Sequence, residues 1–109
     1  MRLTADIWVS AYLARLRAEA IPAFVVARGD AQAGAVLVKL NTLDGRAVLY
    51  QREFDLQSGG RRWAVLSEGD EAVVDASVAR QRGFDRDVWV IEVEDRAGRH
   101  LLDQPGLSD

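Results

Sequence analysis

The first apolar pattern in the chain has the spacing of an amphipathic α-helix. Its stripe consists of Val9, Leu13, Leu16 and Ala20. Trp8 and Tyr12 flank this stripe and widen the side that we expect to be buried. Thr4 suits the N-cap position, and Pro22 disfavours helical backbone in the residue before it. These features together predict a helix over residues 5–20.

Four stretches rich in aliphatic and β-branched residues follow, separated by short loops that contain glycine, asparagine or aspartate. They span residues 24–27, 35–40, 47–51 and 62–66. The stretch over residues 35–40 is apolar on both faces near its start, which indicates a central position in a sheet. By contrast, Gln51, Arg52 and Glu53 are polar enough for a solvated strand end or a sheet edge. Because short loops favour antiparallel neighbours, we expect the four strands to form a meander.

A second helix and a further strand are predicted after the meander. The helix spans residues 71–82, with Asp70 as its cap and Gly83 suited to the position after its end. The strand spans residues 88–93, and a short return strand through residues 99–102 would complete a hairpin. This order of elements predicts an α+β fold, in which two helices pack on a mainly antiparallel sheet.

The length and composition of the chain fit one globular domain. It has 109 residues, of which 49% are hydrophobic and 28% are charged. A second independent core is not expected at this length, and the apolar content is sufficient for one core. We assign residues 1–103 to a single α+β domain and expect residues 104–109 to form a flexible C-terminal tail.

The composition also makes some classes of binding partner and some cellular compartments less expected for this protein. The chain has no cysteine, which excludes disulfides and thiolate chemistry. We see no signal peptide and no apolar run of about 20 residues, so we expect a cytoplasmic protein that does not contact a membrane. The net charge of −3, with acids and bases scattered, argues against a nucleic acid as the partner. Only Lys39 among the fourteen basic residues is a lysine, a bias that we attribute to a GC-rich genome.

Motifs for catalysis, metal binding or nucleotide binding are weak in this sequence. His100 is the only histidine, and no serine or threonine lies in a nucleophile-elbow motif. Glu92 and Glu94 share one strand face, but they alternate with apolar residues as the solvated face of a strand does. The glycines at 29–34 and 59–60 do not open a helix, as a phosphate-binding loop requires. We therefore expect no catalytic residue, metal ion or cofactor, which favours a non-enzymatic role over an enzyme.

The stretch from Arg80 to Trp89 concentrates arginines, acids and aromatic residues at a helix-to-strand corner. The candidate binding residues of this surface are Arg80, Arg82, Asp85, Asp87 and His100. Arginine and tryptophan are frequent at binding hot spots, which supports a recognition surface. We favour the structural alternative, in which Phe84 and Trp89 are core residues and Asp85 or Asp87 fixes one of the arginines. The other two tryptophans are expected in the core for the same reason.

A set of short segments distributed over nearly the whole chain resembles a known protein family. These segments are Asp6–Val9, Arg28–Asp30, Gly34–Lys39, Arg80–Arg82, Phe84–Asp85, Asp87, Trp89–Val90, Glu92, Glu94–Asp95, Gly98–His100 and Leu102–Asp103. The pattern resembles the domain of unknown function 1491 family, which comprises small proteins chiefly from alphaproteobacteria. Its most specific part runs from residue 80 to residue 103. The resemblance implies a bacterial, cytoplasmic setting, and it implies no activity, substrate or catalytic residue.

Three functions are compatible with these observations. We favour a non-enzymatic module that binds a protein partner or forms a homodimer, because no catalytic constellation is present. The second interpretation is an enzyme or small-ligand binder with a site between the sheet and the second helix, at the Arg80–Trp89 corner. The third is a nucleic-acid-binding module that uses Arg52, Arg61 and Arg62 near the hairpin ends.

Overall fold

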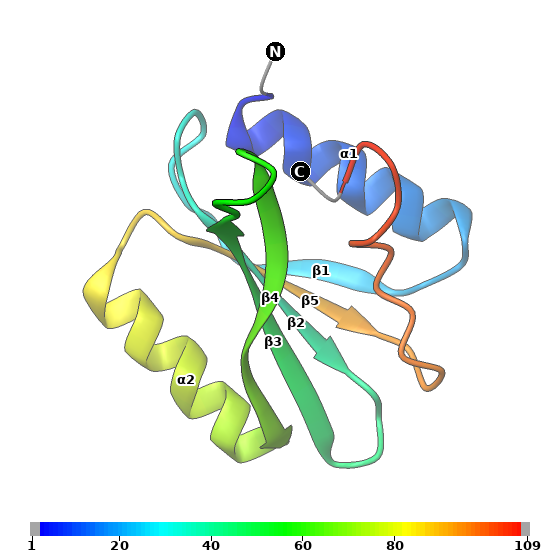
Figure 1. Ribbon diagram of the computed structural model, residues 1–109. Helices are drawn as coiled ribbons and strands as arrows, with labels where there is room; N and C mark the ends of the chain where they lie inside the picture. Colours follow the sequence, from blue (N-terminus) through cyan, green and yellow to red (C-terminus); the bar gives the residue numbers. More distant parts are fainter. Residues whose placement is uncertain (1–2, 108–109) are drawn as a thin grey trace.

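The computed structural model describes residues 3–107 as two helices and one five-stranded sheet (Figure 1). In chain order the elements are α1 (Ala5–Ala18), β1 (Ala23–Ala27), β2 (Val36–Asn41), β3 (Arg46–Phe54), β4 (Arg61–Asp70), α2 (Glu71–Phe84) and β5 (Trp89–Glu94). This order is the predicted one, and the α+β class is confirmed. The boundaries differ from the predicted ones by a few residues at most.

The position of β5 in the sheet differs from the simple meander that the loops suggest. The strand order is β1-β5-β2-β3-β4, with β5 parallel to β2 and antiparallel to β1. Only β2, β3 and β4 form consecutive antiparallel neighbours, because β5 lies between β1 and β2. The helix α2 carries the chain across one face of the sheet from β4 to β5, as a crossover between strands of the same direction requires. The sheet is therefore mixed and mostly antiparallel.

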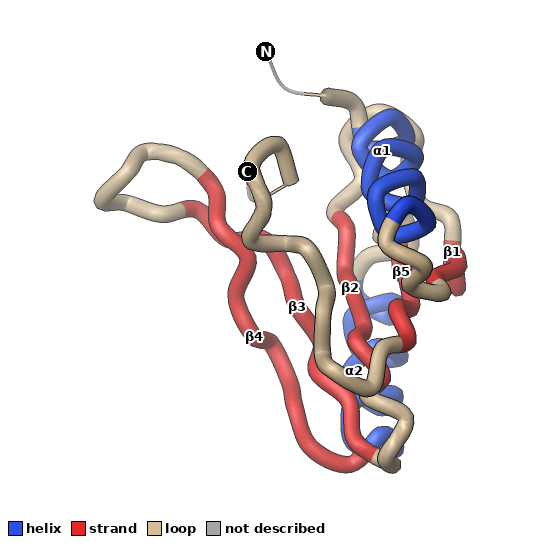
Figure 2. Tube along the Cα trace, turned by 90° about the vertical axis from the view of Figure 1, so that its right-hand side faces the viewer, coloured by secondary structure: helices blue, strands red, loops and turns tan. Residues whose placement is uncertain are grey.

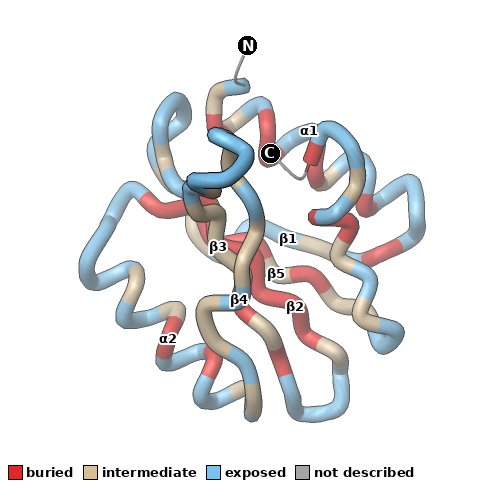
Figure 3. Tube along the Cα trace, viewed as in Figure 1, coloured by how far each residue is buried: buried red, intermediate tan, exposed pale blue. Residues whose placement is uncertain are grey.

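The two helices cover opposite faces of the sheet and create two separate cores (Figure 2). The core on the α1 side contains Trp8, Val9, Tyr12, Leu16, Val36, Val38, Leu40, Trp89, Ile91 and Val93. The core on the α2 side contains Leu37, Ala47, Leu49, Val74, Val88 and Val90. Alternate residues of β2 enter the two cores, since successive side chains of a strand point to opposite faces. Every residue of β2 is buried, which confirms its predicted central position (Figure 3).

A loop caps the start of α1. The amides of the first two helical residues donate hydrogen bonds to the carbonyl oxygens of Gln32 and Ala31, at 3.1 and 2.9 Å. Thr4 forms no side-chain capping bond; its hydroxyl donates to the carboxylate of Asp6 at 2.6 Å. The donors that a helix leaves unpaired at its start are therefore partly satisfied by backbone from a distant part of the chain.

The segment after β5 packs against the α1 side of the sheet. Leu101, Leu102 and Leu107 are buried in the α1-side core, and the indole Nε1 of Trp63 donates to the carbonyl oxygen of Leu107 at 2.9 Å. The return strand predicted over residues 99–102 is not formed in the described structure, which shows loop and turn there. Residues 104–107 were expected to belong to a loose tail, but the buried Leu107 anchors them. The rest of the expected tail, residues 108–109, lies outside the described residues.

Candidate interaction surface at the β1 edge

β1 is an edge strand with an exposed apolar surface. It lies at one end of the strand order, next to β5 only. Phe24, Val25 and Val26 are 47%, 37% and 46% exposed, and no residue of Ala23–Ala27 carries a charge. Exposed apolar edge strands are unusual in isolated proteins, because their unpaired backbone groups can pair with another chain.

The hydrogen-bonding pattern shows which backbone groups of β1 face away from the sheet. The amide of Glu94 donates to the carbonyl oxygen of Pro22 at 2.9 Å, and Phe24 lies opposite Glu92 in the antiparallel register. Backbone groups of antiparallel strands point alternately to the two sides, so the N–H and C=O groups of Ala23 and Val25 point to the free side. Pro22 lacks its N–H on the inner side and therefore removes no donor from the free edge.

The two faces of β1 carry different side chains. Ala23 and Val25 lie opposite Val93 and Ile91, which belong to the α1-side core. Phe24 lies on the other face, where α2 packs over β3 and β4 and leaves the β1 end uncovered. A register shift between Val25 and Ala27 ends the regular pairing of β1. The regular part of the free edge is therefore short and centred on Phe24.

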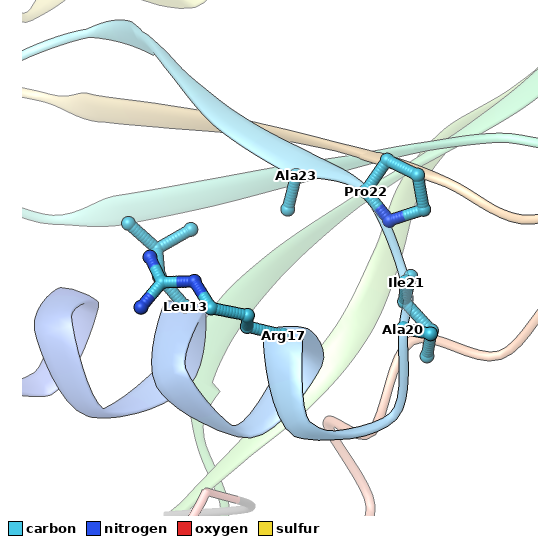
Figure 4. Close-up of a pocket in the computed structure, with 6 residues that line it drawn as sticks. All are labelled: Leu13, Arg17, Ala20, Ile21, Pro22 and Ala23. Carbon is cyan, nitrogen blue, oxygen red and sulfur yellow. The ribbon is translucent and has the colours of Figure 1, made fainter.

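A cavity of about 320 Å³ lies beside the start of β1. It is lined by Leu13, Arg17, Ala20, Ile21, Pro22 and Ala23. Figure 4 shows Leu13 and Arg17 on the side of α1 that faces the strand. The side chains of this lining are apolar apart from the cation of Arg17.

The opposite edge of the sheet, β4, is protected in the usual way. Its exposed positions include the charged side chains of Arg62, Glu68 and Asp70, and only Val65 is an exposed large apolar residue in this strand. The β3–β4 pairing also contains a register shift between Leu49 and Tyr50. β1 also has an irregular pairing, so the difference between the edges lies in the charges of β4, which discourage the addition of another strand. The two edges thus differ in the charge of their side chains, which affects whether an edge can pair with a strand of another chain.

The structure separates the residues of the predicted corner surface. Arg80 and Arg82 are exposed on α2, and neither forms an ion pair with any residue in 3–107. Asp85 accepts a hydrogen bond from the amide of Asp87 at 2.9 Å. His100 lies on the opposite face of the sheet from α2, with its ring 4.8 Å from that of Tyr50. No common site joins the five candidates, and a binding role for this corner stays a prediction.

The aromatic residues of the same corner have different environments. Trp89 is buried, as predicted, and its Nε1 donates to the carbonyl oxygen of Asp30 at 2.7 Å. Phe84 was expected in the core but is 80% exposed, because it is the last residue of α2 and extends past the sheet. Trp8 is buried as expected, and Trp63 is partly buried against the α1-side core.

Two glycines let the loop after β1 dock on the start of β5. A Cβ added to Gly29 or Gly34 would overlap the carbonyl oxygen of Asp87. That oxygen accepts a hydrogen bond from the amide of Asp30 at 2.9 Å, and the amide of Trp89 donates to Ala35 at 2.8 Å. The loop after β1 and the start of β5 both belong to the segments that resemble the family, and they contact each other. We therefore interpret these segments as structural.

His100 is held as a hydrogen-bond acceptor. Its Nδ1 accepts a bond from the amide of Leu102 at 2.9 Å, and its carbonyl oxygen accepts one from the hydroxyl of Tyr12 at 2.8 Å. Burial lowers the pKa of His100, and the charge of Asp103 partly opposes this effect. These contacts fix the loop after β5 against α1 and bring no nucleophile to the imidazole.

The single lysine lies in an ion cluster on the α2 side. The Nζ of Lys39 is 2.7 Å from carboxylate oxygens of Glu71 and Asp75 and 3.3 Å from Glu92. Burial by itself would lower the pKa of Lys39, but hydrogen bonds to Asp75 and Glu71 and the charge of Glu92 raise it above its usual range. Asn41 donates to both Glu71 and Glu92. These polar groups satisfy one another, so we interpret the cluster as structural.

Across residues 3–107, no group of three or more histidine, aspartate or glutamate side chains is arranged to hold a metal ion. Neither helix within that range has the length and apolar character needed to cross a membrane.

Comparisons with known proteins place the chain among proteins of one family. The model of the family described as "Protein of unknown function (DUF1491)" matches residues 3–103. A crystal structure of a DUF1491 family protein from Caulobacter crescentus CB15 is similar, with a TM-score of 0.83 and 39% identity, over 96% of this chain and 97% of that chain. An NMR structure of a DUF1491 family protein from the same organism gives a TM-score of 0.82 and 40% identity, over 96% of each chain.

A more distant similarity is to the solution structure of protein Atu0922 from Agrobacterium tumefaciens. Its TM-score is 0.73 and its identity is 31%, over 86% of each chain. No curated protein matches the chain. The family resemblance of the sequence is therefore confirmed.

Proposed function

The chain belongs to the DUF1491 family, and from its own geometry we propose that it is a self-association module that forms a homodimer through the free edge of β1. The observation that carries this proposal is the exposed, uncharged edge strand, whose outward N–H and C=O groups at Ala23 and Val25 lack a neighbouring strand. An enzymatic role has less support, since the described residues show no catalytic constellation. A cytoplasmic location remains part of this proposal.

The short regular part of β1 can pair with a second copy of itself. A two-fold axis at Phe24 would place Ala23 of one copy opposite Val25 of the other, on both sides of the axis. This arrangement uses all four outward-pointing groups of Ala23 and Val25 in antiparallel hydrogen bonds. Such an isologous pairing closes on itself and yields a dimer with a continuous ten-stranded sheet.

Phe24 gives this pairing its main side-chain contact. In the proposed register, Phe24 faces its own copy at a non-hydrogen-bonded position, where opposed Cα atoms approach to about 4.5 Å. Aromatic pairs at such positions stabilise neighbouring strands, whereas like charges directly opposite destabilise them. No charged residue lies within Ala23–Ala27 to oppose the approach of the two copies.

Size-exclusion chromatography with light scattering tests the proposal. We expect the mass of two chains for the native protein at concentrations of roughly 100 μM, and the mass of one chain for Phe24→Lys. Val65→Lys is the matched control, because Val65 has a similar exposure on the opposite edge and should leave the dimer intact. A native protein that stays monomeric, or a Phe24→Lys variant that still dimerises, would refute the proposal.

A charge-complementation experiment separates loss of pairing from loss of folding. Phe24→Lys and Phe24→Glu should each be monomeric alone, because equal charges meet across the two-fold axis. Mixed in equal amounts, they should form a heterodimer in which opposite charges face each other. A mixture that stays monomeric, while both variants retain the native amide spectrum, would count against the Phe24-centred register.

A further inference from the structure

A cavity between the end of α2 and the sheet has the chemistry of a small-ligand site, and it is distinct from the β1 edge. It measures about 220 Å³ and is lined by residues from the start of β2, the end of β3 and the last turn of α2. Its polar lining includes the side-chain amides of Gln51 and Gln81. We propose that this cavity binds a small planar ring that carries a hydrogen-bond donor and an acceptor side by side, as a cyclic amide or a nucleobase does.

The fold directs the two glutamine side chains into the same space. Gln51 lies opposite Leu37 in the antiparallel register, and Leu37 belongs to the α2-side core. Because paired residues of neighbouring strands share a face of the sheet, Gln51 points toward α2. On the helix, Gln81 follows the core residue Val74 by two turns and therefore lies on the face that packs against the sheet.

The cavity lies where both elements change from apolar to polar side chains. Along β3, the fully buried Leu49 is followed on the same face by Gln51. On α2, Val78 packs against the core and is followed on the same face by Gln81 and Asp85. Beyond this level the helix and the sheet contribute polar groups to the space between them, where a ligand can reach those groups.

The two amides have hydrogen-bonding capacity for a ligand. Both glutamines are partly buried, and neither side chain hydrogen-bonds to another residue within the described range 3–107. A primary amide has an acceptor oxygen and two donor hydrogens in one plane. A ring with an N–H group beside a C=O group matches this arrangement, because it can accept from one edge of the amide and donate to the other.

The rest of the lining suits a flat ring. Leu37 and Val88, which belong to the α2-side core, contribute apolar side chains. Phe54 also lines the cavity and is 60% exposed, so its ring is available to stack on a planar ligand. Apolar walls combined with a few polar groups that fix orientation are the usual form of a small-molecule site.

The charges and the volume favour a small neutral ligand. Two arginines, Arg52 and Arg61, and two acids, Glu53 and Asp85, line the cavity. Since these charges are equal in number, the lining selects neither an anion nor a cation. Sites for drug-sized ligands measure about 300–1,000 Å³, so a cavity of about 220 Å³ suits a single ring. Asp85 also connects this cavity with the corner surface that the sequence predicted.

Amide NMR of the full chain tests this inference, because glutamine side chains give their own signals. The probes are uracil and pyrimidine, which has the same ring but neither an N–H nor a C=O group. We expect uracil to shift the side-chain signals of Gln51 and Gln81 and the backbone signals of Leu37 and Val88. Pyrimidine should bind at least about fivefold more weakly, because it cannot donate to the amides. Equal binding of the two rings, or no shifts with uracil at about 10 mM, would overturn the inference.

A third probe, uridine monophosphate, distinguishes a free ring from the base of a nucleotide. Tighter binding of the nucleotide than of uracil would assign the site to a nucleotide base. Weaker binding of the nucleotide would assign it to a free ring, because the sugar then does not fit beside the walls of the cavity.

Two glutamine variants sharpen the test. Gln81→Met keeps a side chain of similar length but removes the amide, so we expect the affinity for uracil to fall at least about fivefold. Gln57→Met is the matched control, because Gln57 is exposed and does not line the cavity. Equal affinities of the two variants, each with the native backbone spectrum, would refute the site. Neither substitution lies in β1, so light scattering measures dimerisation separately.

Discussion

The two faces of the sheet are stabilised in different ways, although they share the same central strand. On the α1 side, alternate residues of β2 meet a helix that contributes Trp8, Tyr12 and Leu16 to a continuous apolar core. On the α2 side, the helix contributes Val74 to the core and half-buried Val78 at its margin. There the buried Lys39 of β2 extends the contact between the sheet and the helix, because its ammonium forms ion pairs with carboxylates.

This difference shows how a helix with a narrow apolar stripe is attached to a sheet. The α1 side distributes its stability over many apolar contacts, so no single residue dominates. The α2 side concentrates its polar contact on one cation shared by three acids. Removing that cation leaves the acids facing one another, and removal of one partner from a buried ion cluster is strongly destabilising. The faces should therefore respond differently to substitution and to pH.

Lys39→Met should produce the largest effect. The substitution keeps an apolar side chain of similar length but removes the charge that Glu71, Asp75 and Glu92 share. We expect a loss of about 3 kcal/mol in the free energy of unfolding, measured by urea denaturation at neutral pH, since Glu71 and Asp75 can partly relax into solvent. Added salt should recover part of this loss by screening the acids. A loss below about 1 kcal/mol would mean that the cluster contributes little.

The raised pKa of Lys39 fixes the pH range in which the cluster acts. A lysine with a higher pKa in the folded state than in the unfolded state stabilises the protein fully below its unfolded value of 10.5. This contribution is then lost as the pH rises through the folded value. The ammonium of Lys39 should consequently stay charged between pH 5 and pH 7.5, where the other predictions are tested.

Leu107→Ala should have the next largest effect and tests the packing of the C-terminal segment. Leu107 is 1% exposed in the α1-side core, so we expect its truncation to cost about 2 kcal/mol in urea denaturation. Leu56→Ala is the control, because Leu56 is 88% exposed and its truncation should change stability by less than about 0.5 kcal/mol. Equal, small effects of the two substitutions would indicate that residues 104–107 are loose after all.

His100→Gln should have the smallest effect, visible only in acid. Burial lowers the pKa of His100, so the unfolded chain binds a proton more readily than the folded protein does. Native stability should therefore fall as the pH drops below about 6.5, because protonation removes the acceptor for the Leu102 amide. Urea denaturation should show that the free energy of unfolding decreases less between pH 7.5 and pH 5 for the variant than for the native protein. An identical decrease in the two proteins would mean that groups other than His100 cause the loss of stability in acid.

The sequence predicted the helices and strands well because their signals are local. The spacing of Val9 and Leu16, the apolar run of β2 and the short loop before β3 each depend on residues close together in the chain. The same signals placed Trp8 and Trp89 in the core. The sequence predicted only part of the candidate surface. It indicated an apolar strand over residues 24–27, but nothing in the order of these residues shows that this strand lies at an edge of the sheet.

Local periodicity thus determined which elements form, in what order, and that β2 lies at the centre. Tertiary structure alone decided that β5 inserts beside β1, that Phe24 and Phe84 are exposed, that Leu107 is buried, and that Gln51 and Gln81 line one cavity. The physical reason is that the spacing of apolar residues shows on which face of its own helix or strand a residue lies. Edges, cavities and exposed ends depend instead on which distant segments pack together, and that choice is made by the free energy of the whole chain.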